Sequence, residues 1–307
     1  MQDTASFPTG TFSKMRYRPV KRPDDMAALD ELFEIVHESD GHRPIGEHKY
    51  LDLLHADPER ATGLVAVEDD EIVGYLAVTQ TQQPEVWAME IALHPMHRSL
   101  GDIRSILHAG VERAGPGARL LRMWAYQPRY VQVLDEMGFE TERELRQLRR
   151  RLPLDERFEM PRGIDVRSFR PGVDDDVWLQ VNNAAFAGHP ENGAWTREIL
   201  EDRKRQDWFD VDGFRMAWEG DELVGFCWTK MHEGAVGEIY VIAVAPAHRR
   251  RGIGAALVSD GLRYLEGERG AEVGMLYVDA DNLTANALYG RLGFRLDHVD
   301  RALVKRL

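Results

Sequence analysis

The chain has 307 residues, about twice the roughly 150 residues of a typical domain, so we expect two domains. A composition of 43% hydrophobic and 30% charged residues is that of a globular protein and not of a disordered one. Acidic residues outnumber basic ones by 52 to 39, and the net charge of −13 disfavours binding to nucleic acid. The single cysteine, Cys227, excludes an intrachain disulfide.

No apolar run reaches the roughly 18 residues of a membrane span, and the N-terminal residues lack the basic-then-apolar order of a secretion signal. These features predict a cytoplasmic protein, and we expect a monomer that binds neither a membrane nor nucleic acid. The basic run at residues 146–151 has two interpretations, a nucleic-acid patch or a solvated strand. The acidic net charge favours the strand.

The sequence repeats itself in one order and at nearly one offset. The offset is 151 residues, as from Gly74 to Gly225, for three segments and 155 residues for a fourth. The matched segments are 70–75 with 221–226, 91–95 with 242–246, 97–101 with 248–252, and 137–139 with 292–294. This agreement predicts a tandem duplication. The expected divisions are a flexible tail over residues 1–14, an N-terminal domain over 15–152, a linker over 153–163 and a C-terminal domain over 164–307.

Both halves should share one order of elements, which is clearest in the second half. There we expect a strand over 164–168, helices over 174–186 and 196–207, a hairpin of strands 214–219 and 222–230, a strand over 238–244, a helix over 252–267, a strand over 272–278, a helix over 283–292 and a strand pair from 295 onward. This pattern predicts a mixed α/β fold with a central mixed β-sheet flanked by helices in each domain.

The most informative segment, residues 249–255, lies between a predicted strand and a predicted helix. It contains three arginines followed by Gly252 and Gly254. A helix N-terminus has unpaired N–H groups and partial positive charge, and glycine lets an anion approach the backbone closely. The segment therefore predicts a pyrophosphate site, although a solvated basic turn is the alternative. The dinucleotide-binding fingerprint and the P-loop both require other residues at these positions.

The spacing Arg249-x-x-Gly252-x-Gly254 resembles the Gln/Arg-x-x-Gly-x-Gly/Ala coenzyme A loop of the GNAT N-acetyltransferase superfamily. The strand before it and the later Gly293-Phe294 also resemble that family. The resemblance implies acetyl-CoA as the acetyl donor and direct transfer to an amine, so that Cys227 is not needed as a nucleophile. The residues that it implies for coenzyme binding are Ile242, Ala243, Val244, Arg249, Arg250, Arg251, Gly252, Ile253, Gly254, Ala255 and Asn282.

Two residues are candidates for acid–base chemistry. Glu238 stands in a mostly apolar strand, where it is a general base, an anchor for the substrate ammonium group, or a strand-end charge in water. Tyr289 stands where the family often has a tyrosine that protonates the departing thiolate, and the alternative is a core aromatic.

The first half lacks these features. Its loop has Ser99, Leu100, Asp102 and Ile103 in place of residues that favour a phosphate, and the offsets place Trp87 and Leu134 opposite Glu238 and Tyr289. We expect this degenerate half to bind acetyl-CoA poorly or not at all.

A closer resemblance concerns the acceptor. Residues 181–196, 208–210, 228–230, 237–241 and 276–278 are similar to the mycothiol synthase family of tandem GNAT proteins. That resemblance implies acetylation of the cysteinyl amine of a cysteine–glucosamine–inositol precursor. The acceptor contacts that it implies are Glu47, Glu191, Lys230, Glu238 and Tyr277. The alternatives are a tandem GNAT enzyme for another small amine, such as an aminoglycoside or amino acid, and a non-enzymatic coenzyme sensor or scaffold.

Overall fold

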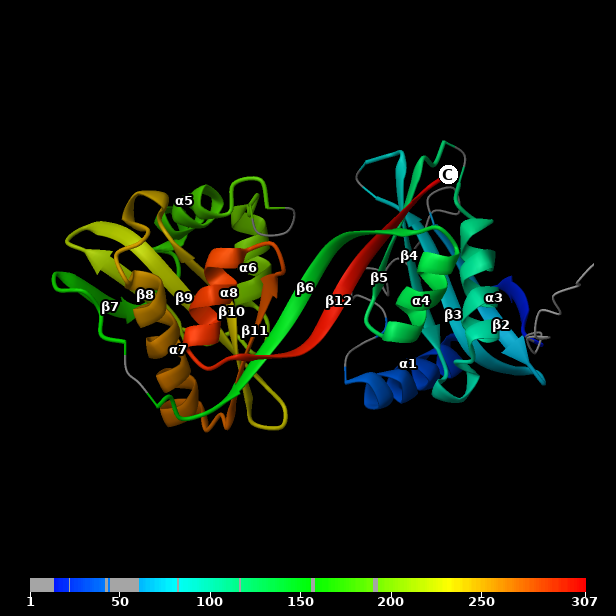
Figure 1. Ribbon diagram of the computed structural model, residues 1–307, viewed down its shortest axis with the longest axis horizontal. Coiled ribbons are helices and arrows are strands. Elements are labelled where there is room, and N and C mark those ends of the chain that lie inside the picture. Colours follow the sequence, from blue (N-terminus) through cyan, green and yellow to red (C-terminus); the bar gives the residue numbers. More distant parts are fainter. Residues whose placement is uncertain are drawn as a thin grey trace, which may run out of the picture. The chain divides into compact units, whose positions relative to one another are not determined.

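The computed structural model describes residues 14–21, 23–41, 44, 61–81, 83–115, 117–155, 158–189 and 193–307. The predicted tail up to residue 13, Glu47 and Glu191 lie outside these ranges. The chain forms two compact units (Figure 1). Unit 1 consists of Met1–Glu144 with Asp300–Leu307, and unit 2 consists of Leu145–Val299. Within the described part of the chain, no helix has the length and apolarity to cross a membrane.

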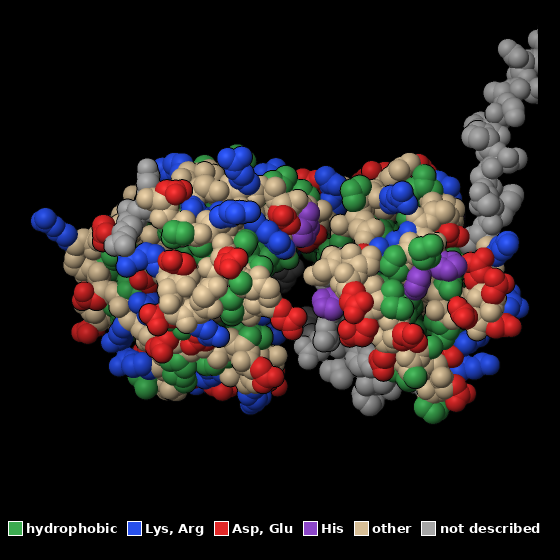
Figure 2. All heavy atoms as spheres, turned by 90° about the horizontal axis from the view of Figure 1, so that it is seen from below, with side chains coloured by type: hydrophobic (Ala, Val, Ile, Leu, Met, Phe, Trp, Pro, Cys, Tyr) green, Lys and Arg blue, Asp and Glu red, His purple; other side chains and the backbone are tan. Residues whose placement is uncertain are grey.

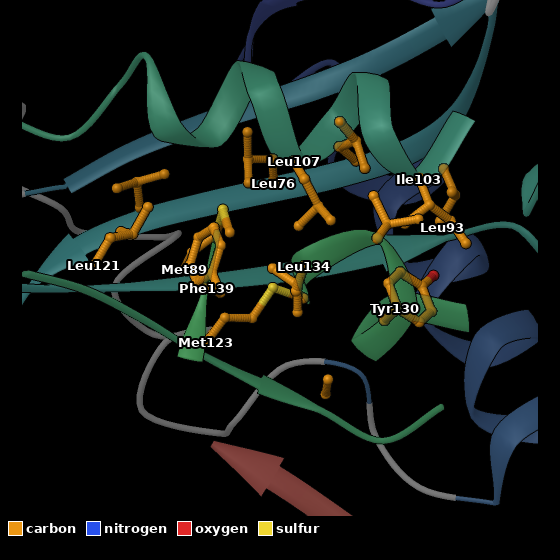
Figure 3. Packing of buried hydrophobic residues seen from close by; sticks show 14 of the residues in the cluster. Leu76, Met89, Leu93, Ile103, Leu107, Leu121, Met123, Tyr130, Leu134 and Phe139 are labelled. Atoms are coloured by element: carbon orange, nitrogen blue, oxygen red, sulfur yellow. The ribbon is translucent and has the colours of Figure 1, made fainter. Parts of the chain in front are cut away.

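Unit 1 is a mixed sheet in the order β1-β2-β3-β4-β5-β12, in which β4 and β5 are parallel. Its elements are β1 (Arg16–Pro19), α1 (Met26–Asp40), β2 (Ala61–Glu68), β3 (Glu71–Gln80), β4 (Val86–Leu93), α3 (Leu100–Val111), β5 (Leu120–Ala125) and α4 (Pro128–Glu136). Figure 3 shows its core, where Leu107 of α3 and Leu134 of α4 point toward Met89 of the sheet.

Unit 2 has the matching order β6-β11-β10-β9-β8-β7, in which β10 and β11 are parallel. Its elements are β6 (Glu140–Arg151, from Leu145 on), β7 (Ile164–Ser168), α5 (Asp175–Ala185), α6 (Arg197–Lys204), β8 (Phe214–Glu219), β9 (Glu222–His232), β10 (Val236–Val244), α7 (Ile253–Arg269), β11 (Val273–Asp279) and α8 (Leu283–Arg291). The predicted mixed α/β fold is confirmed, and the helices and strands predicted for this half lie within three residues of the observed bounds at both ends.

The side chains of β9 divide between a core on each face of this sheet, and an extra residue at Val224 shifts their alternation by one. Val224 and Cys227 pack with α7 and α8, whereas Leu223, Phe226 and Trp228 pack with α5 and α6. Burial raises the pKa of the Cys227 thiol, which is fully enclosed against Gly261 of α7. Cys227 is therefore a core residue, and its thiol stays protonated.

Two strands begin in one compact unit and end in the other. Residues 145–151 of β6 pair with β11 and so belong to unit 2. The prediction of a strand pair from residue 295 onward is wrong, because β12 (Arg295–Arg306) is one continuous strand. Its residues 301–306 pair with β5 of unit 1, and Lys305 there donates a hydrogen bond to the Met137 carbonyl. The compact units thus differ from the expected boundaries by an exchange of strand segments.

The expected linker and the basic run both pack against unit 2. Phe158 and Met160 contact the core beneath α7, and the Phe158 N–H donates to Ser259 Oγ at 3.4 Å. The basic run forms the strand that the sequence favoured, but Gln147 and Leu148 are buried rather than solvated. In Figure 2 acidic and basic side chains are intermixed over the face that is drawn.

Candidate active site

Strands β10 and β11 of unit 2 diverge partway along their length. They pair only from Val236 opposite Val273 to Ile239 opposite Leu276, whereas β10 continues to Val244 and β11 to Asp279. Residues 242–244 therefore have no partner on the β11 side, while their other side pairs with β9. This opening exposes backbone N–H and C=O groups beside the loop that leads to α7.

The N-terminus of α7 has no side-chain cap. Its N-cap is Gly252, at φ +87°, and a Cβ added there would meet no atom within 4 Å. A Cβ added to Gly254 would lie 3.6 Å from the Val244 side chain, which is ordinary contact. No described side chain thus takes up the N–H groups of the first helical turn, as an anion-binding helix N-terminus requires.

The three arginines of the loop have different environments. Arg249 donates to the Ala185 carbonyl at 3.0 Å, and Arg251 forms a bidentate pair with Glu219 at 2.6 and 2.9 Å. Arg250 has φ +63°, and none of the described residues forms a hydrogen bond or ion pair with its side chain. It is the loop cation that is free to meet a phosphate. Asn282 caps α8 by accepting from the Ala285 N–H at 3.1 Å, which leaves its amide NH₂ exposed.

Lys230, Glu238 and Tyr277 share one face of the sheet. Glu238 lies opposite Lys230 of β9 and Met275 of β11, and Tyr277 follows two residues after Met275. Tyr240 is an extra residue in β10, because the register passes from Ile239 to Val241 without it. This bulge turns Tyr240 to the same side as Glu238. The register therefore brings together three of the predicted acceptor contacts, and Glu47 and Glu191 lie outside the described residues.

Glu238 is 7% exposed and makes a close contact that the sequence did not predict. Its Oε2 lies 2.6 Å from Nε2 of His232, which follows Lys230 by two residues on β9. The i, i+2 spacing from Lys230 was the available signal, because it places His232 on the same face.

A cationic and aromatic group adjoins Glu238. Lys230 Nζ lies 4.8 Å from the ring centroid of Trp208 and 5.8 Å from that of Tyr240. Burial raises the pKa of Tyr240, Arg203 of α6 lowers it and Glu238 raises it, so both charges act on this phenol. The Arg203 Nε is buried without a hydrogen-bond partner among the described residues. Sequence reasoning missed Arg203, because one arginine in a polar helix carries no distinguishing pattern.

Tyr289 approaches from the other face. It is 6% exposed and packs with Ile239, Ile253 and Phe294 beneath α7. Burial raises the pKa of its phenol, and none of the described residues accepts a hydrogen bond from its hydroxyl. The phenol is therefore protonated at neutral pH and has a proton to donate.

The acetyltransferase (GNAT) family model matches residues 26–139 and 178–294. The chain is 41% identical over 291 residues to the mycothiol acetyltransferase of Acidimicrobium ferrooxidans, covering 90% of this chain and 92% of that protein. It is also 41% identical to the mycothiol acetyltransferase of Streptomyces coelicolor, covering 91% of each. This chain belongs to the mycothiol acetyltransferase family of GNAT proteins. It is an acetyl-transferring enzyme whose donor is acetyl-CoA.

Solved structures agree on the fold of this GNAT protein. A GCN5-related N-acetyltransferase from Sphaerobacter thermophilus has a TM-score of 0.69 at 23% identity, covering 96% of this chain and 97% of that one. A tandem GNAT protein of the clavulanic acid pathway has a TM-score of 0.67 at 15% identity, covering 95% and 98%. The family model and the relatives confirm the predicted GNAT membership, and the two segments that the model matches confirm the tandem arrangement.

In unit 1, side chains occupy the N-terminus of α3, which corresponds to the N-terminus of α7 in unit 2. Ser99 accepts from the Asp102 N–H at 3.1 Å, and Asp102 accepts from the Ser99 N–H at 3.3 Å, which forms a capping box at α3. A carboxylate thus occupies the end of α3 that corresponds to the uncapped end of α7. Arg98 is turned inward to Asp40, with contacts at 2.7 and 3.0 Å.

Apolar residues also occupy the positions of unit 1 that correspond to Glu238 and Tyr289. Leu134 takes the place of Tyr289 within the core drawn in Figure 3. The match of Trp87 to Glu238 is wrong by one residue, because β4 lacks the bulge of β10. Ala88 lies opposite Thr79 as Glu238 lies opposite Lys230, so the register places Ala88 there. No carboxylate stands at this point of β4.

Proposed function

We propose that this enzyme transfers the acetyl group of acetyl-CoA to the cysteinyl amine of a cysteine–glucosamine–inositol acceptor, which yields mycothiol. The 41% identity to proteins named mycothiol acetyltransferase supports this acceptor. The single structural observation that supports it best is the buried Glu238 carboxylate, in register with Lys230 beside the opening between β10 and β11. The acceptor is a small polar molecule. We also propose that the enzyme acts as a monomer in the cytoplasm.

The donor site would be the opening and the loop that follows it. Backbone groups of Ile242, Ala243 and Val244 are available to the pantetheine arm, because β11 does not pair with them. The diphosphate would meet the uncapped N-terminus of α7, from Gly252 to Ala255, together with Arg250. Arg249 and Arg251 would shape the loop through Ala185 and Glu219, and Asn282 would add its exposed amide.

Glu238 is proposed as the general base. The cysteinyl ammonium first releases one proton to solvent, and the neutral amine attacks the thioester carbonyl carbon. The carboxylate takes the second proton from this nitrogen as the amide forms, and the C–S bond breaks to release the thiolate, which accepts a proton from Tyr289. Glu238 and Tyr289 then return to their starting protonation states by exchange with solvent. An α-amine has an ordinary pKa of about 7.7–8.0, so the base has only a modest task near neutral pH. The burial of Glu238 and its place on the face of Lys230 and Tyr277 support this role.

Tyr289 is proposed as the acid that protonates the leaving thiolate. Glu238 and Tyr289 pack on opposite faces of the sheet, so a thioester lying in the gap between β10 and β11 meets one group from each side. The raised pKa of Tyr289 keeps the proton on the phenol until the thiolate forms.

Lys230, Tyr277, Glu47 and Glu191 are proposed to bind the hydroxyl-rich acceptor together with Glu238. Charged side chains form strong hydrogen bonds with hydroxyl groups, and Gln147 donates to the Tyr277 hydroxyl at 2.6 Å, which fixes its direction. Tyr277 is 40% exposed, so a ligand can reach it.

The test is an acceptor assay on the full chain, read by mass spectrometry. Acetyl-CoA with the cysteine–glucosamine–inositol acceptor should yield a product heavier by one acetyl group. Aminoglycosides and free amino acids serve as competing amines in parallel reactions. An unmodified acceptor beside another acetylated amine would replace this proposal with the broader GNAT alternative, and coenzyme binding without any transfer would favour a sensor.

A further inference from the structure

His232 is the side chain closest to Glu238 that neither the sequence pattern nor the proposed chemistry uses. Its Nε2 lies 2.6 Å from Glu238 Oε2, and about a third of the His232 side chain is exposed. The other imidazole–carboxylate contacts among the described residues are longer, for example at 2.9 Å for His97 with Glu68 and at 3.1 Å for the exposed pair of His298 with Asp297. Here the carboxylate is 9% exposed, so its single histidine contact determines its orientation.

We propose that His232 is the positioning residue for the catalytic carboxylate, an inference that rests on the proposed role of Glu238. An ionised carboxylate can only accept hydrogen bonds, so the His232 Nε2 must carry the hydrogen and donate it. This bond commits Oε2 and leaves Oε1 for the amine of the acceptor. A bond to an ionised group is among the stronger protein hydrogen bonds, so it holds the carboxylate in one orientation.

The strand geometry keeps the two groups together. His232 and Lys230 lie on one face of β9, Glu238 lies opposite Lys230, and Val236 lies opposite His232. The hairpin thus places imidazole and carboxylate two residues out of register on neighbouring strands, which is a diagonal contact across a sheet. The pairing of β9 with β10 fixes the backbone positions of both residues, so the contact depends only on their side-chain rotamers.

No other described residue positions the Glu238 carboxylate through a hydrogen bond. The other charged or titratable groups on this face include Lys230 of β9, Tyr240 of β10, Tyr277 and Asp279 of β11, Arg149 and Arg151 of β6, and Arg203 of α6. Asp279 pairs with His189 at 3.3 Å. Arg149 donates to Gln147, and Lys230 lies over the rings of Trp208 and Tyr240. Helix α5 brings Asp175 to this side, and its carboxylate is paired with Lys204 and Arg197. None of these groups forms a hydrogen bond with Glu238 in the described chain.

The test compares His232→Leu with His232→Gln in the full-length enzyme. Gln places an amide N–H near the position of Nε2, whereas Leu fills similar space without a donor. We expect His232→Leu to lower kcat/KM about tenfold to a hundredfold, mainly through kcat and with little change in the acceptor KM, because the carboxylate is no longer held in place. His232→Gln should recover most of the rate. Acetyl-CoA affinity should be unchanged in both, which also shows that they fold.

Controls separate this inference from the function on which it rests. His298→Gln, in the exposed pair of the same unit, should leave the rate as in the wild type. In a Glu238→Gln background, His232→Leu should cause no further loss, because its partner is already gone. A wild-type rate in His232→Leu, equal loss in the Gln and Leu variants, or additive loss in the double variant would overturn the positioning role. Full turnover by Glu238→Gln alone would instead overturn the assignment of the base.

Discussion

At the scale of single residues, the position of Glu238 makes the sharpest prediction. Glu238→Gln keeps the size and hydrogen-bonding shape of the side chain but cannot take a proton. We expect kcat to fall about 10²- to 10⁴-fold, the usual contribution of a general base, with acetyl-CoA affinity unchanged. Steady-state kinetics with calorimetric titration of the coenzyme measures both. A loss of coenzyme affinity equal to the loss of rate would contradict the role of a base.

The three loop arginines should differ in their effect on the donor. Arg250 has no partner in the described chain, whereas Arg251 is already engaged by Glu219 and Arg249 by Ala185. We expect Arg250→Ala to weaken acetyl-CoA binding about tenfold, the value of one charge-assisted hydrogen bond, and Arg251→Ala to weaken it less. Calorimetric titration of each variant tests this order, which equal losses at the two positions would refute.

Tyr289 gives a prediction about pH. Burial raises the pKa of its phenol above the ordinary value of 10.0, so the proton stays on the group throughout the neutral and mildly alkaline range. A raised pKa means that the acid is lost only at still higher pH, so the wild-type kcat should show no alkaline limb from this residue below about pH 10. Tyr289→Phe should lower kcat about a hundredfold at every pH. Wild-type turnover by that variant would make Tyr289 a core aromatic only.

The sequence was sufficient to identify residues whose type is unusual for the element in which they lie. Glu238 in an apolar strand and the glycines at 252 and 254 are visible as exceptions to a pattern. The contact of His232 with Glu238 and the Ala88 equivalence were not visible, because both depend on cross-strand register, and Arg203 was missed because one arginine in a polar helix has no distinguishing pattern. One extra residue, Tyr240, changes that register and the offset between the halves, and nothing in its side chain announces a bulge.

At the scale of elements, the two helix N-termini explain why the halves differ. Helix α7 begins at Gly252 with no cap, and α3 begins at Ser99 with a capping box that includes Asp102. The same capping that stabilises α3 by about 1 kcal/mol removes the N–H groups and the positive potential that an anion requires. Stability and anion binding compete for one set of donors.

This competition predicts a single coenzyme per chain. Titration of the full chain with acetyl-CoA should give a stoichiometry of one, and Gly254→Ile, which copies Ile103 of unit 1, should abolish it or weaken it at least tenfold by obstructing the backbone. The matched control is Ile103→Gly, which should gain no coenzyme site because Asp102 remains. A stoichiometry of two in the wild type would show that the capped helix also binds.

At the scale of the whole molecule, the exchanged strand segments decide how the chain can be divided. The sequence repeat correctly predicted two similar halves, since equal offsets follow from duplication. It could not predict that residues 145–151 and 300–307 belong to the opposite units, because pairing partners are not encoded in a local pattern. Hydrophobic alternation identifies a strand but not its neighbour.

Removing residues 300–307 should therefore damage the unit that is far from them in sequence. Unit 1 would lose the strand that pairs with β5 and the hydrogen bond from Lys305 to the Met137 carbonyl. It would also lose the contact of Arg301 Nε with Glu144 Oε1 at 2.6 Å. We expect rapid amide hydrogen exchange in β5 of the truncated chain, with protection retained in β9 and β10. Faster exchange confined to unit 2 would contradict the exchange of strands.

The exchange also imposes an order on biosynthesis. Residues 145–151 leave the ribosome before the rest of unit 2, so that unit has its edge strand from the start. Residues 300–307 are made after all of unit 2, and until then the β5 edge of unit 1 is an open template for wrong pairing. The half that is translated first is thus the half that is completed last, and a chaperone that shields an exposed sheet edge would act on this chain at β5.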